Sequence, residues 1–111
     1  MANHDEAAIE QEIKGKGLTA PRLSPEDIDG TIVDEKYHVF EDTTLTVCVL
    51  ILRNGYTVTG ESAAVSKENF DEEIGRKIAR ENARNKIWSL EGYLLRDCLF
   101  QKSQFTPETK D

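Results

Sequence analysis

The firmest structural signal in this chain is residues 44–62, TLTVCVLILRNGYTVTGES. Its first half is rich in β-branched and aliphatic residues, and the Asn54-Gly55 pair that follows is typical of the tight primed turn of a β-hairpin. The sequence therefore predicts two antiparallel strands joined at Asn54 and Gly55. A two-residue loop at these positions sets Ile51 opposite Val58.

One face of this hairpin is expected to form the core. With the register of a two-residue loop, alternation places five apolar side chains on that face: Val47, Val49, Ile51, Tyr56 and Val58. The reverse face carries Cys48, Leu50 and Leu52, which is too apolar for free exposure, so a second layer or another subunit should cover part of it. A strand-like run at 37–40 precedes the hairpin and would extend it to a three-stranded meander.

Helical periodicity follows the hairpin. Asn69 with Glu72 fits a capping-type start, and the pattern continues to about Phe100. Two apolar stripes lie on nearly opposite sides of it: Phe70, Ile74 and Ile78 on the first, and Ala79, Ala83, Ile87, Leu90 and Leu94 on the second. The segment is therefore one long helix, or two helices broken near Ser89 to Gly92, where glycine weakens helical structure.

The length of that helix bears on oligomeric state. An unbroken helix of some thirty residues extends about 45 Å, which is longer than a compact monomer of this mass can cover. We therefore expect a homo-oligomer.

The residues before the hairpin are polar and contain several helix breakers. Residues 7–14 predict a short acidic helix, and Ser24-Pro25 predicts the start of a second one that runs to about Asp34. The expected fold class is α+β: an antiparallel hairpin or meander followed by one long or broken C-terminal helix. The expected organisation is a flexible acidic arm over 1–23, a single domain over 24–103 and a disordered tail over 104–111.

Composition excludes several classes of function. The longest apolar stretch, 47–52, is far too short to cross a bilayer, and residues 1–10 lack the pattern of a secretory signal. No Gly-rich phosphate loop, nucleophile elbow or paired His-Glu metal motif occurs in the chain. Cys48 and Cys98 lack zinc-site spacing and are expected to be small buried hydrophobes. We therefore expect no membrane span, no metal, no cofactor and no enzymatic activity, and residence in the cytoplasm.

Positive charge is concentrated in one part of this acidic chain. Residues 76–86 carry five cations against Glu81, a local charge of +4, so that the other hundred residues sum to −11 within a net charge of −7. Arg76, Arg80 and Arg84 recur every four residues, so they share one side of a helix and can hold phosphate or carboxylate oxygens bidentately. The candidate ligand-binding set also includes Lys77 on the flank, with Asn82, Asn85 and Trp88 for amide hydrogen bonds and base stacking.

Ordinary packing is the alternative to this binding set. The three arginines would then be solvated or paired with Glu72, Glu73 and Glu81. Such exposed ion pairs are common and weak. Trp88 would then anchor a core or an interface instead of stacking on a base.

Four segments together resemble one known family: TLTVCVL (44–50), NGYTVTGES (54–62), NFDEEIGRKIARENA (69–83) and IWSLEGYLL (87–95). They are similar to the small tailed-phage and prophage proteins named for gene product 49 and gene product 66. This resemblance implies a phage origin and action in the host bacterial cytoplasm, and it supplies no ligand, reaction or catalytic residue. In size and element order the chain is also similar to the phage sponge proteins that sequester nucleotide signals of the Thoeris defence.

These observations lead to three hypotheses of function. The first is a non-enzymatic, oligomeric phage accessory protein that captures an anionic, nucleotide-type immune signal as a counter-defence. The second is an inhibitor that engages a basic host enzyme through the acidic remainder of the chain. The third is a structural phage component. Sequence-specific nucleic-acid binding is not expected of a chain this acidic.

Overall fold

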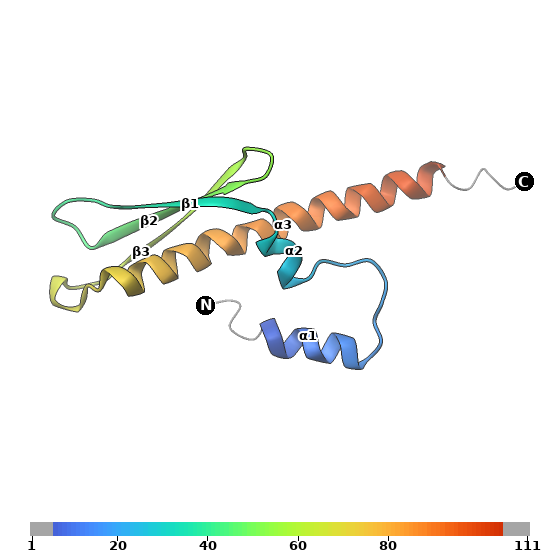
Figure 1. Ribbon diagram of the computed structural model, residues 1–111, viewed down its shortest axis with the longest axis horizontal. Helices are drawn as coiled ribbons and strands as arrows, with labels where there is room; N and C mark the ends of the chain where they lie inside the picture. The colour runs from blue at the N-terminus through green and yellow to red at the C-terminus, as the bar shows by residue number, and fades with distance from the viewer. Residues whose placement is uncertain (1–5, 106–111) are drawn as a thin grey trace, which may run out of the picture.

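The computed structural model describes residues 6–105, and the expected tail lies largely outside this range. The elements in chain order are α1 (Glu6–Gly15), α2 (Pro25–Asp29), β1 (Ile32–Val39), β2 (Leu45–Leu52), β3 (Thr57–Ala63), a 3-10 turn (Lys67–Asn69) and α3 (Glu72–Phe105). The strands form one antiparallel sheet in the order β1-β2-β3, and α3 lies along one face of it (Figure 1). The expected α+β class, with a three-stranded meander before a long helix, is confirmed.

The turn between β2 and β3 holds three residues, 53–55, and not the two that were expected. The Leu52 N–H donates to the Tyr56 carbonyl at 2.8 Å, and Gly55 takes a left-handed φ of +88°. Glycine at this position of a three-residue loop is a common hairpin geometry. The pairing consequently shifts by one residue, so that Leu50 lies opposite Val58.

This shift places the core on the other face of the sheet. The prediction of a core built from Val47, Val49, Ile51 and Tyr56 is wrong, because the three aliphatic side chains are half-buried on the open face and Tyr56 is 57% exposed at the hairpin tip. With Val58 opposite Leu50, the buried face gathers Cys48, Leu50, Leu52 and Val58 against α3. The face that was expected to need a covering layer is therefore the core, and α3 is its cover.

Gly60 allows α3 to lie directly on β3. A Cβ atom at Gly60 would stand 2.3 Å from the Ala83 nitrogen and 2.4 Å from the Ala79 carbonyl oxygen. Both alanines and Ile87 are fully buried. The first three residues of the second predicted apolar stripe therefore pack on the sheet, whereas Leu90 and Leu94 at its end are 39% and 49% exposed. On the first stripe, Ile74 is 55% exposed.

The long helix is continuous, and its start differs from the prediction. α3 runs for 34 residues without the break that was considered near residues 89–92. Asp71, and not Asn69, accepts the N–H of Ile74 at 3.0 Å, because residues 67–69 form the 3-10 turn. Cys98 on this helix is exposed, so the expectation that both cysteines are buried is wrong for Cys98 and correct for Cys48.

The segment before the sheet is also shorter than predicted. Ser24 and Asp27 cap α2 reciprocally, with hydrogen bonds of 3.2 and 2.9 Å. The helix ends at Asp29 instead of near Asp34. Ile32 therefore begins β1, where it pairs with Leu52.

Candidate functional site

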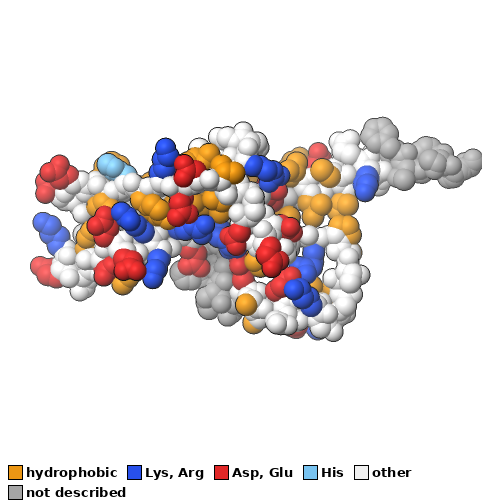
Figure 2. All heavy atoms as spheres, in the orientation of Figure 1, with side chains coloured by type: hydrophobic (Ala, Val, Ile, Leu, Met, Phe, Trp, Pro, Cys, Tyr) orange, Lys and Arg blue, Asp and Glu red, His pale blue; other side chains and the backbone are white. Residues whose placement is uncertain are grey.

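The cations of α3 do not form one open clamp. Blue and red side chains are interspersed along the helix and the adjoining strand in Figure 2. Arg76 pairs with Glu72 at 3.5 Å, one turn earlier on the same helix, and Lys77 pairs with Glu73 at 3.7 Å. Each of these cations therefore has a carboxylate partner, as the alternative interpretation of the sequence anticipated.

Arg80 is held by a different element. Its Nε donates to Glu35 of β1 at 2.7 Å, so this ion pair ties the helix to the edge of the sheet. The hydrogen bond from Arg80 keeps the pKa of the Glu35 carboxyl below its ordinary value, although burial opposes the shift. Glu35 also accepts a hydrogen bond of 3.1 Å from the hydroxyl of Tyr37.

Arg84 is a nearly buried cation that holds other elements of the fold together. Its Nε donates to Asp29 at 2.7 Å, and its two terminal nitrogens donate to Glu6 at 2.8 and 3.3 Å and to the Pro25 carbonyl at 3.3 Å. Burial by itself would lower the pKa of Arg84, but the hydrogen bonds that it donates to Glu6 and Asp29 outweigh burial and raise that pKa. With its side chain only 11% exposed, Arg84 joins α1 and α2 to α3.

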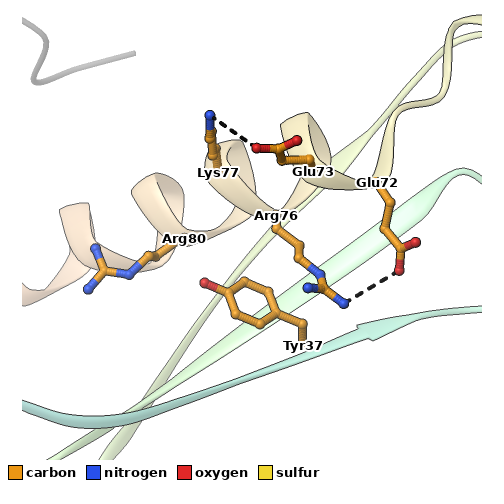
Figure 3. A pocket seen from close by; sticks show the side chains of 6 residues that line it. All are labelled: Tyr37, Glu72, Glu73, Arg76, Lys77 and Arg80. Carbon is orange, nitrogen blue, oxygen red and sulfur yellow. Dashed lines mark ion pairs between the residues drawn. The ribbon is translucent and has the colours of Figure 1, made fainter.

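Three of the cations of α3 line a shallow groove beside β1. This hollow has a volume of about 370 Å³, and Figure 3 labels the side chains that line it: Tyr37, Glu72, Glu73, Arg76, Lys77 and Arg80. The guanidinium of Arg76 stands over the Tyr37 ring, 5.3 Å from its centroid. Between the first turns of α3 and β1, the groove thus brings together three cations and an aromatic ring. The carboxylates that pair with two of these cations line it as well.

Tyr37 is the aromatic residue of this groove, and it was not among the site residues predicted from the sequence. Burial, the neighbouring Cys48 and the hydrogen bond to Glu35 raise the pKa of Tyr37 to about 12, so the phenol stays protonated at neutral pH. It lies on a strand far from the helix in sequence. No periodicity within residues 76–88 points to it.

The other predicted site residues lie outside the groove. Asn82 donates to the Glu61 carbonyl of β3 at 2.9 Å, and Asn85 is half-buried. Trp88 packs against the core cluster, in agreement with the packing alternative, and its indole nitrogen has no hydrogen-bond partner among residues 6–105. The structure therefore brings Arg76, Lys77 and Arg80 together and separates them from Asn82, Arg84, Asn85 and Trp88.

The described part of the chain lacks a metal site and a membrane-spanning helix. Within residues 6–105, no group of three or more His, Cys, Asp or Glu side chains could hold a metal ion. None of the helices in that range is long and apolar enough to cross a membrane.

The fold and groove define a small α+β protein in which a three-stranded meander packs on one long helix and a basic groove opens at the sheet edge. The chain belongs to the Phage protein (N4 Gp49/phage Sf6 gene 66) family, which it matches over residues 23–99. This match confirms the family resemblance. Comparison with curated proteins and with solved structures finds no match for the chain.

Proposed function

We propose that this phage protein acts by binding, without catalysis, and that its groove captures a small anionic ligand of the nucleotide class. The observation that supports this proposal is the meeting of Arg76, Lys77 and Arg80 with the Tyr37 ring in one hollow. A phosphate group suits the guanidinium groups, which can donate two parallel hydrogen bonds to it. When Arg76 turns toward the phosphate, the face of the Tyr37 ring that it now covers becomes free to stack on a base, the role that the sequence had suggested for Trp88.

The counter-ions of Arg76 and Lys77 in the groove are suited to exchange with a ligand. In the first pair, the side chain of Arg76 is 52% exposed and that of Glu72 is 58% exposed. In the second pair, Lys77 is 74% exposed and Glu73 is 80% exposed. Exposed pairs of this kind contribute little to stability, so an incoming phosphate displaces the carboxylates at small cost. Arg84 is different, because three partners hold it in a nearly closed site.

Binding alone is sufficient for the biological role that we propose, which is sequestration of a host nucleotide signal in phage counter-defence. Membership of a phage family is consistent with that role. A sponge lowers the free signal when its sites outnumber the signal molecules and its dissociation constant lies below their concentration. A small protein that can be made in many copies meets the first condition.

Isothermal titration calorimetry tests this proposal with cyclic dinucleotides and cyclic ADP-ribose isomers as probes. Arg76→Gln removes one bidentate donor, and a charged hydrogen bond of about 1.5–3 kcal/mol corresponds to a loss of roughly 10- to 100-fold in affinity. Lys86→Gln is the matched control, because it removes one positive charge from the same helix outside the groove. Circular dichroism verifies that both variants remain folded.

The proposal is overturned if none of these probes binds the wild-type protein. It is also overturned if Lys86→Gln loses as much affinity as Arg76→Gln, because the binding would then be general attraction to positive charge.

A further inference from the structure

We infer that the C-terminal part of α3 is a dimerisation surface, on which a second copy of this chain packs antiparallel and sets its Phe100 against Tyr93. This inference rests on a different part of the molecule from the proposed ligand groove and is independent of it. Four features support it: the length of the helix, the exposure of its aromatic residues, the charge of the segment and the spacing of Tyr93 and Phe100.

The helix is much longer than the sheet that it covers. Its 34 residues extend about 51 Å at 1.5 Å per residue, whereas the eight-residue β2 extends about 26 Å. In Figure 1 the orange-to-red part of α3 projects past the sheet. Among the described strands, none covers this projecting part, so its apolar side chains lack the layer that covers Ala79, Ala83 and Ile87.

Large apolar side chains are exposed where the sheet ends. Four of them lie on the helix and one at the hairpin tip: Leu90 (39% exposed), Tyr93 (74%), Leu94 (49%), Phe100 (55%) and Tyr56 (57%). Between the hairpin tip and the helix lies a hollow of about 380 Å³, whose lining includes Tyr56, Leu90, Tyr93 and Leu94 together with the ion pair of Arg53 and Glu91. Such a hollow, bordered by aromatic rings, is suited to receive an aromatic side chain.

The charge of this segment favours a second copy over other occupants. Residues 90–105 contain Glu91, Arg96, Asp97 and Lys102, and therefore sum to zero in a chain of net charge −7. Nucleic acid or an anionic membrane would require excess positive charge here, and a basic protein would require excess acid. Two copies of an acidic chain repel each other least where each is neutral, so the neutral apolar end of α3 is where they can meet.

The spacing along the helix is self-complementary. Tyr93 and Phe100 are seven residues apart, so they share one side of the helix and are separated by about 10 Å along it. A two-fold axis midway between them, near Arg96 and Asp97, sets each Tyr93 against the partner's Phe100 and the reverse. The opposite charges of Arg96 and Asp97 keep like charges from accumulating at the axis.

Sedimentation equilibrium over micromolar concentrations, with matched variants, tests the dimer. The wild-type chain should reach the dimer mass, and Phe100→Ser should weaken association at least about tenfold by removing both aromatic pairs. Ile74→Ser is the control, because Ile74 is an equally exposed apolar residue of the same helix, 55% in each case. It should dimerise like the wild-type protein.

Isotope-filtered NMR on a mixture of labelled and unlabelled protein tests the orientation. Contacts between the rings of Tyr93 and Phe100 should cross between copies, because these rings are too far apart on one helix to give such signals. A monomeric wild-type chain, an equal effect of Ile74→Ser, or a dimer without the Tyr93–Phe100 contacts would each overturn the inference.

Discussion

Substitution of Gly60 by alanine should move α3 off the sheet. The added Cβ would stand 2.3 Å from the Ala83 nitrogen, 2.4 Å from the Ala79 oxygen and 2.9 Å from the Ala83 Cα, all of them backbone atoms that no rotamer change can withdraw. Overpacking that side chains can absorb costs about 1–3 kcal/mol. Because the whole helix must shift here, we expect Gly60→Ala to lower the free energy of unfolding by about 3 kcal/mol or more.

Urea denaturation followed by circular dichroism measures this loss directly. Gly92→Ala, on α3 itself, is the matched control, because its added Cβ meets only Leu23 Cδ1 at 4.0 Å, an ordinary contact. Alanine is the better helix former by about 1 kcal/mol, so this control should stabilise the protein. The reasoning is refuted if Gly60→Ala unfolds within about 1 kcal/mol of the wild type, the lower limit for such strain.

Three further predictions concern the ion pairs and Tyr37. Arg84→Gln leaves two carboxylates without their cation, so we expect a loss of roughly 2–4 kcal/mol in urea denaturation and faster proteolytic cleavage between α1 and α2; unchanged cleavage would contradict the proposed role of Arg84. Tyr37→Phe should abolish the ionisation step near pH 12 in an absorbance titration at 295 nm. Because folding raises the pKa of Tyr37, its contribution to stability is complete below about pH 10 and declines above it. Glu35 has a lowered pKa, so its contribution is present above about pH 4.3 and is lost in acid, and Glu35→Gln should reduce the acid sensitivity of the unfolding free energy.

Much of the fold could be predicted because its signals are local. The turn residues and the β-branched run identify β2 and β3, and helical spacing identifies α3. The core face could not be predicted from these signals, because Asn54-Gly55 fits a two-residue turn as well as a three-residue turn with Gly55 left-handed. That one residue decides which side of β2 faces the helix.

The site was only partly predictable for a related reason. Four-residue spacing locates the cations on one helix, but their partners come from distant positions. Glu35 is 45 residues from Arg80, and Glu6 is 78 residues from Arg84. Helical spacing carries no information on which acid reaches which arginine, so the division between the buried Arg84 and the accessible Arg76 appears only in the folded chain.

The central claim is that three of the arginines of α3 have two different roles: Arg76 and Arg80 line the ligand groove, and Arg84 is a closed structural residue. NMR detection of the arginine Nε–H groups, during titration with a cyclic dinucleotide or a cyclic ADP-ribose isomer that binds in calorimetry, tests this division. We predict that the signals of Arg76 and Arg80 shift while that of Arg84 stays in place. A shift confined to Arg84, or no shift at any of the three at saturating ligand, would contradict the account.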